Sequence, residues 1–122
     1  MQNNLEDEKY INLETVRKNG NVVKTPVWFV MDQDTMYIRT VAESGKVKRA
    51  RNNAHVRIAL CEADGKLTGE WMPAQAREVK DAAIDKMVDK KLDQKYGLMK
   101  KVMGLMSAFQ KRAYTVLEVK IG

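Results

Sequence analysis

Hydrophobic and polar residues alternate along much of the first two thirds of the chain, in runs separated by turn-forming residues. A period of two is typical of a strand with one buried face, and Asn-Gly or Asp-Gly pairs favour tight hairpin turns. Turns are predicted at Asn19-Gly20, Asp32-Gln33-Asp34 and Asp64-Gly65. The predicted strands cover residues 10–16, 22–31, 36–40, 56–60, a run from residue 67 onward, and 114–121.

Two of these runs make more specific predictions. In the first strand, Ile11, Leu13 and Thr15 alternate with Asn12 and Glu14, so the second set is expected to face solvent. The apolar run at residues 27–31 has no polar face. It is therefore expected to be buried on both sides or to lie at a subunit contact.

After residue 79 the period of the pattern changes to that of a helix. Asp81 is a predicted N-cap, and Tyr96-Gly97 is a predicted left-handed stop. Between them the apolar face consists of Ile84, Met87, Val88 and Leu92. A second helix is predicted from Leu98, with Met99, Val102, Met103, Met106 and Phe109 on one stripe that we interpret as core filling.

This order of elements predicts a mainly β (α+β) fold. Six antiparallel strands would form a small barrel, with a short basic helix and a C-terminal helical pair packed outside it, because closure removes exposed strand edges. The chain has 122 residues, of which 44% are hydrophobic, which suits one core. With no internal repeat or linker, residues 1–122 are expected to form a single domain.

The distribution of charge bears on localisation. The longest stretch without a charged residue, residues 102–110, is far shorter than the roughly 20 apolar residues that a membrane-spanning helix needs. The first residues turn acidic at Glu6, Asp7 and Glu8, the reverse of a secretory signal. We therefore expect a cytoplasmic protein without a membrane partner.

Counting residues excludes several chemistries. With one cysteine, Cys61, the chain cannot form an internal disulfide, and with one histidine, His55, it cannot supply the usual ligands of a zinc site. His55 lies at the entry to a predicted strand, where a surface position is more typical than a catalytic base. Glycine-rich phosphate loops of the Rossmann and P-loop types are absent. No catalytic side chain and no metal ligand are predicted.

The net charge of +6 is concentrated in one segment. Residues 39–57 carry six basic residues and one acidic residue. Within it, the run Ser44-Gly45-Lys46-Val47-Lys48-Arg49 follows a strand and can open a helix, whose free N–H groups and positive dipole end favour a phosphate. A solvated basic face and a nucleic-acid surface remain alternatives, although no RNP motif or stacking aromatics accompany the lysines.

The motifs together resemble a known superfamily. They are Leu13-x-Thr15-x-Arg17-x-x-Gly20, Thr25-Pro26-Val27-Trp28-Phe29, Met36-Tyr37-Ile38-Arg39-Thr40, the run 44–49, Arg51-Asn52-Asn53, residues 56–61, Gly65, Gly69 and residues 74–76. In this order they resemble the pyridoxamine-phosphate-oxidase-like split β-barrel superfamily, and most of all its branch dependent on the deazaflavin coenzyme F420. The resemblance covers about residues 8–80, and later residues are similar in layout only.

The resemblance implies a homodimer with a flavin-type cofactor in a groove near the subunit interface. Thr40, Ser44, Gly45 and Lys46, with Lys48 and Arg49 behind them, would meet the cofactor's phosphate, and Pro26, Val27 and Trp28 would line its ring. The implied activity is hydride transfer from reduced F420 to an electron-poor small organic acceptor. An FMN-dependent oxidoreductase and a non-enzymatic flavin or deazaflavin carrier are alternatives of the same fold, and a nucleic-acid-binding barrel is an alternative outside it.

Overall fold

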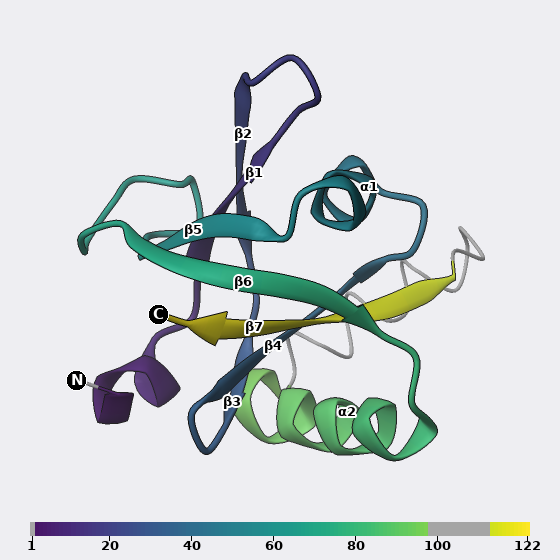
Figure 1. The fold of residues 1–122 in the computed structure, drawn as a ribbon. Helices are drawn as coiled ribbons and strands as arrows, with labels where there is room; N and C mark the ends of the chain where they lie inside the picture. Colours follow the sequence, from purple (N-terminus) through teal and green to yellow (C-terminus); the bar gives the residue numbers. More distant parts are fainter. Residues whose placement is uncertain (1, 98–112) are drawn as a thin grey trace.

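The computed structural model describes residues 2–97 and 113–122 (Figure 1). The chain begins with a short 3-10 helix, η1 (Gln2–Asp7). The strands are β1 (Ile11–Val16), β2 (Val22–Val27), β3 (Val30–Asp32), β4 (Thr35–Val41), β5 (His55–Leu60), β6 (Met72–Val79) and β7 (Tyr114–Ile121). The helices are α1 (Gly45–Asn52) and α2 (Ala82–Tyr96).

All seven described strands belong to one curled antiparallel sheet in the order β2-β1-β5-β6-β7-β4-β3. The predicted class, a mainly β split barrel with helices outside, is therefore confirmed. The two edge strands, β2 and β3, are consecutive in the chain. The chain thus crosses from one edge of the sheet to the other within two residues, Trp28 and Phe29.

This crossing explains why the structure has seven strands instead of the predicted six. The run at residues 22–31 was predicted as one strand, but β2 pairs with β1 whereas β3 pairs with β4. The two residues between them therefore leave the ladder. Phe29 turns into the core, and its N–H donates instead to the hydroxyl of Tyr96 at 3.0 Å.

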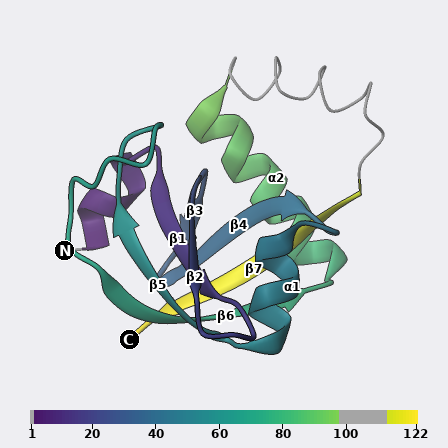
Figure 2. The same cartoon turned by 90° about the horizontal axis from the view of Figure 1, so that it is seen from above.

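Apolar side chains form two clusters on the two faces of the sheet. The inner face of the curled sheet holds the larger cluster, and Val47 and Ala50 of α1 belong to it. On the outer face, Val88, Leu92 and Tyr96 of α2 pack against β3, β4 and β7. Figures 1 and 2 show the two helices on different sides of the sheet.

Most of the predicted turns and caps are confirmed. Gly20 and Gly65 adopt positive φ angles of 90° and 92°, as their turns require. The Asp81 carboxylate accepts hydrogen bonds from the N–H groups of Ala83 and Ile84, and α2 ends at Gly97 with φ 51°. The helix predicted from Leu98, including its methionine stripe, lies outside the described residues.

Two further details of the strand prediction are wrong. The strand expected from residue 67 begins at Met72, because Leu67 makes only an isolated bridge to Cys61. The expected solvent-facing residues of β1 are buried, with Asn12 6% and Glu14 4% exposed. On this side, β1 is covered by the segment between β5 and β6. The Asn12 side-chain amide donates a hydrogen bond to the carbonyl of Gly65 in that segment, at 3.2 Å.

Glu14 is buried as part of a row of charges across three strands. It pairs in register with Lys24 of β2 and Arg57 of β5, and both of its carboxylate oxygens accept hydrogen bonds from Arg57 at 2.7 Å. The ring of Trp71 lies within 5.4 Å of the Lys24 ammonium and 5.0 Å of the Arg57 guanidinium. A charge can be buried here because it is paired and hydrogen-bonded.

None of the helices that the structure describes is both long enough and apolar enough to cross a bilayer.

Candidate functional site

The turn from β4 into α1 places an exposed helix N-terminus beside the basic run. Ser44 is the N-cap, with extended backbone angles, and its N–H donates to the carbonyl of Val41 at 3.1 Å. Its hydroxyl makes no capping bond, although it is buried and has no hydrogen-bond partner among the described residues. A buried hydroxyl without a partner costs free energy, so a ligand that accepts from it would be favoured.

Arg49 folds back over the start of the same helix. Its Nε donates to the hydroxyl of Thr15 at 2.6 Å, which anchors the guanidinium on β1. A Cβ atom added at Gly45 would lie 2.5 Å from Nη1 of Arg49. The guanidinium therefore lies across the first residue of α1, in space that only a glycine leaves open.

Three cations gather at this point. Burial and the neighbouring charge of Arg49 lower the pKa of the Lys46 ammonium, and burial and the charge of Arg17 lower the pKa of Arg49. The first turn of α1 contains no acidic residue. Because these cations repel one another and lose hydration, an anion bound among them would be stabilised by all three. We call Arg17, Lys46, Arg49 and the Ser44 hydroxyl the α1 cation cluster.

The other basic residues of α1 have acidic partners or face solvent. Arg51 forms an ion pair with Glu78 at 2.8 Å, and the Lys48 ammonium lies 4.0 Å from Glu43 with most of its side chain exposed. Lys48 is therefore not part of the α1 cation cluster. The predicted residues Ser44, Gly45, Lys46 and Arg49 are brought together.

Thr40 lies at an open edge of the sheet beside α1. It is buried near the end of β4, and β3 pairs only with Thr35, Met36 and Tyr37. The described part of the chain therefore leaves one edge of β4 unpaired from Ile38 to Val41. The outer edge of β2 is likewise unpaired within the sheet.

The residues predicted to line a ring lie at the other end of β1. Val27 pairs with Ile11, whereas the anchor of Arg49 is Thr15, four residues along the strand, or roughly 14 Å. Trp28 stacks on Tyr96 with ring centroids 4.2 Å apart and an interplanar angle of 9°. Val27 packs against the inner-face cluster, as α1 does, whereas Trp28 packs against the outer-face cluster and so lies on the other side of the sheet from the α1 cation cluster.

The sequence analysis did not assign Thr15 or Arg17 to the site. Both stand in the motif Leu13-x-Thr15-x-Arg17-x-x-Gly20, and that motif, with the positive charge of Arg17, was the signal that could have indicated them. No local pattern in the sequence indicates that Thr15 accepts a hydrogen bond from a residue 34 positions away.

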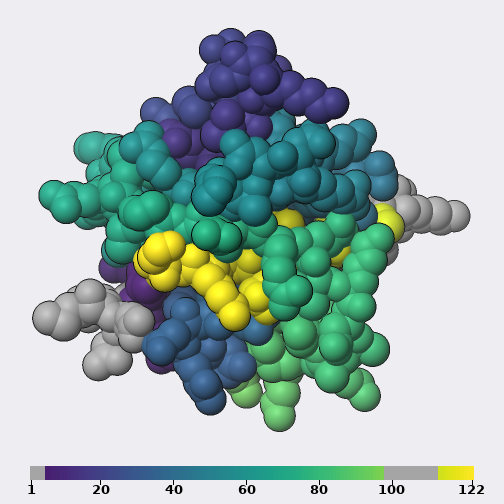
Figure 3. Space-filling model, viewed as in Figure 1, coloured from purple at the N-terminus to yellow at the C-terminus, as the bar shows by residue number. Residues whose placement is uncertain are grey.

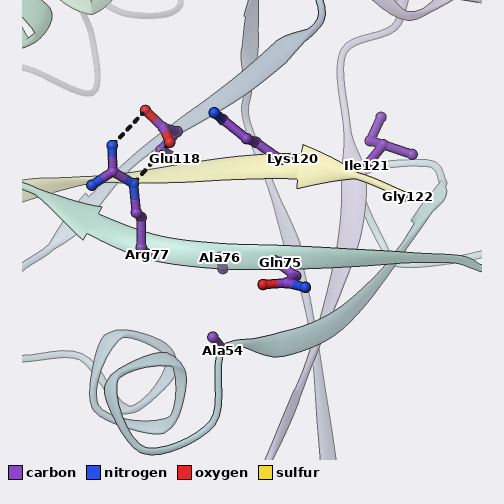
Figure 4. Close-up of a pocket in the computed structure, with 8 residues that line it drawn as sticks. All are labelled: Ala54, Gln75, Ala76, Arg77, Glu118, Lys120, Ile121 and Gly122. Atoms are coloured by element: carbon purple, nitrogen blue, oxygen red, sulfur yellow. Dashed lines mark hydrogen bonds and ion pairs between the residues drawn. The ribbon is translucent and has the colours of Figure 1, made fainter.

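A hollow lies on the outer face of β6 and β7, away from the α1 cation cluster (Figure 4). It has a volume of about 530 Å³ and is lined by Ala54, Gln75, Ala76, Arg77, Glu118, Lys120, Ile121 and Gly122. Sequence reasoning did not predict it, because its polar residues come from two strands 41 residues apart. Within the described ranges, no three His, Cys, Asp or Glu side chains are grouped to hold a metal ion.

Comparisons with known proteins identify a family and its fold. The sequence model of the family described as pyridoxamine 5′-phosphate oxidase matches residues 1–122. The search of curated proteins found no match.

Several solved structures share the fold at low sequence identity. HutZ, the heme storage protein of Vibrio cholerae, is 16% identical with a TM-score of 0.74, over 99% of this chain and 87% of that one. A candidate pyridoxamine 5′-phosphate oxidase of Listeria innocua is 16% identical with a TM-score of 0.69, over 96% and 86%. An FAD-binding protein of Mesorhizobium loti is 16% identical with a TM-score of 0.65, over 98% and 84%.

Proposed function

Since the chain belongs to the pyridoxamine 5′-phosphate oxidase family, we propose that it binds a flavin-type cofactor and acts as an oxidoreductase. The cofactor that we propose is the deazaflavin coenzyme F420, used in its reduced form to transfer hydride to an electron-poor small organic acceptor. The observation that carries this proposal is the α1 cation cluster. It combines three cations and an unpartnered buried hydroxyl at a helix N-terminus without an acidic residue.

The residues of the cluster fit the phosphate of such a cofactor. The Ser44 hydroxyl would donate to one phosphate oxygen, and Lys46 and Arg49 would neutralise its charge. The first N–H groups of α1 have no partner within the helix and would complete the set of donors. The absence of a Cβ at Gly45 lets the Arg49 guanidinium lie close to this position.

The ring of the cofactor would lie toward Pro26 and Val27, on the inner side of the sheet. The distance along β1 from Thr15 to Ile11 suits a ligand whose ring and phosphate are joined by a ribityl chain. When bound, the cofactor supplies the hydride chemistry, so the chain needs no nucleophile of its own. Val27 would line the ring on the inner side of the sheet, and Trp28, which stacks on Tyr96 in the outer-face cluster, would hold the adjoining backbone in place.

FMN is the second candidate cofactor. The fold similarity to an FAD-binding protein supports an isoalloxazine ring as well as a deazaflavin ring. A carrier without turnover is the corresponding non-enzymatic candidate, since a heme storage protein shares the fold. We also propose that the chain forms a homodimer with the cofactor near the interface, which light scattering of the purified protein would test.

The test of the phosphate site is a titration of the Lys46→Ala variant with F420 and with FMN, followed by fluorescence at fixed salt. Loss of one charge-assisted contact is expected to weaken binding by about tenfold or more. Lys90→Ala, an exposed position on α2, is the matched control and should leave the affinity unchanged. Equal affinities for Lys46→Ala and wild type would refute the assignment of the cluster to the phosphate.

A further inference from the structure

The outer face of the sheet is covered at both sides and open in the middle. The helix α2 packs over β3, β4 and Val116 of β7, and the segment between β5 and β6 covers β1 at Asn12. Between them, atoms of β7 reach the surface, as the yellow strip in Figure 3 shows. The groove of about 530 Å³ lies over this open part of β6 and β7.

Four polar side chains from neighbouring positions stand in the groove. Gln75 and Arg77 of β6 pair in register with Lys120 and Glu118 of β7. Residues two apart on a strand point to the same face, so these four form a square on the outer face. The remaining lining residues are small or apolar, and among them the side chains of Ala76 and Ile121 pack in the inner-face cluster.

Glu118 fixes the position of Arg77 but does not occupy all of the hydrogen-bond donors of its guanidinium. Its Nε and Nη2 donate to the two oxygens of Glu118 at 2.9 and 3.4 Å (Figure 4). The Glu118 side chain is 7% exposed, whereas that of Arg77 is 69% exposed. A guanidinium carries five N–H donors, so the end formed by its two terminal nitrogens remains available for a second oxyanion.

Lys120 adds a second positive charge across the strand pair. Among the described residues, neither the Lys120 ammonium nor the Gln75 side-chain amide has a hydrogen-bonding partner. Glu118 is the only acidic side chain lining the groove, and it is paired with Arg77, while the terminal carboxylate of Gly122 adds a negative charge at the Ile121 end of the lining. The groove therefore offers a guanidinium held by Glu118, an ammonium and an amide on the outer face of β6 and β7.

We propose that this groove binds a small organic oxyanion, whose carboxylate or phosphate group is held between Arg77 and Lys120 and hydrogen-bonded to Gln75. The site is separate from the α1 cation cluster, because Gln75 and Arg77 face outward whereas Val47 and Thr15 lie on the inner side of the sheet. The proposal does not depend on the nature of the cofactor.

The test is a two-dimensional NMR titration of the ¹⁵N-labelled full chain with sodium succinate, with inorganic phosphate in a second series, against sodium chloride at matched ionic strength. Saturable amide shifts are expected for Gln75, Arg77 and Lys120 with at least one of the two probes. The probe that binds more tightly identifies the preferred oxyanion.

Two variants locate the anion without disturbing the fold. Lys120→Gln removes an exposed, unpaired charge, and Arg77→Lys keeps a cation beside Glu118 but removes the guanidinium fork. Each is expected to weaken binding about tenfold, while Lys86→Gln on the exposed side of α2 should not change it. The proposal is overturned if neither probe gives saturable shifts there, if the shifts occur only around Ser44 and Lys46, or if both variants bind like wild type.

Discussion

Gly45 is the residue on which the geometry of the α1 cation cluster depends most directly. Because Gly45 has no side chain, the Arg49 guanidinium can lie against it. In this position Arg49 also donates a hydrogen bond to Thr15. A larger residue at this position must push away the flexible end of Arg49. The stability of α1 itself does not require the glycine, since alanine is favoured over glycine in helices.

The Gly45→Ala variant separates these two effects. We expect unchanged or slightly higher thermal stability, together with cofactor affinity reduced about tenfold because Arg49 loses its position. Thermal unfolding and the fluorescence titration would be measured on the same preparation. Unchanged affinity in the variant would show that the position of Arg49 is irrelevant to binding.

Glu14 links the stability of the fold to pH. The hydrogen bonds and the charge of Arg57 hold the pKa of its carboxyl below the ordinary value of 4.5. At pH values between the two pKa values, the Glu14 carboxyl binds a proton in the unfolded chain but not in the folded chain. The Glu14–Arg57 pair therefore stabilises the fold fully above about pH 4.5. This stabilisation is lost as the pH falls through the lower pKa of the folded state. Glu78 contributes with the same sign through Arg51 and Thr115.

We expect the free energy of unfolding, measured by urea titration, to fall as the pH is lowered below about 4.5. The Glu14→Gln variant cannot titrate at this position, so its stability should depend less steeply on pH in the same range. Identical slopes for the variant and wild type would contradict this account of the Glu14–Arg57 pair.

At the scale of elements, Tyr96 connects three segments that are distant in the sequence. Its hydroxyl accepts from the N–H of Phe29 at 3.0 Å, and its one proton lies within reach of two carbonyl oxygens, that of Lys9 at 2.8 Å and that of Phe29 at 3.0 Å. The same ring stacks on Trp28. The end of α2 thus holds the point at which the chain crosses between the two edges of the sheet.

Removing the hydroxyl in Tyr96→Phe is expected to destabilise the fold by about 1–3 kcal/mol, since the N–H of Phe29 loses its partner in a buried position. Tyr96→Leu also removes the stacked ring and should cost roughly 1 kcal/mol more. Urea unfolding of the two variants measures both steps. If Tyr96→Phe were as stable as wild type, the hydroxyl would have no role at this crossing.

The strands show which structural features can be predicted locally. The hairpin turns and the helix cap at Asp81 depend on residues within a few positions, and their prediction was confirmed. The division of residues 22–31 into β2 and β3 depends on which strand each half pairs with, so an unbroken apolar run does not reveal it. The burial of Asn12 and Glu14 depends on a covering segment about 50 residues away, which alternation cannot indicate.

At the scale of the whole molecule, the curled sheet brings together charges that the sequence keeps apart. The basic run at residues 44–49 was predicted as a phosphate site, and the structure adds Thr15 and Arg17 from the first hairpin. Which lysines turn into the cluster and which face solvent is decided by the packing of α1 against the sheet. The positions of Trp28 and of the groove on β6 and β7 likewise follow from the closure of the sheet.

The most direct test of the central claim is a parallel equilibrium titration of the purified chain with F420 and FMN at moderate salt, followed by fluorescence. We expect saturable binding with one cofactor per chain, tighter for F420 than for FMN, and weakened for both by Lys46→Ala. A preference for FMN would contradict the deazaflavin assignment and support the FMN alternative. Saturable binding of neither cofactor would contradict the central claim, that the α1 cation cluster holds the phosphate of a flavin-type cofactor.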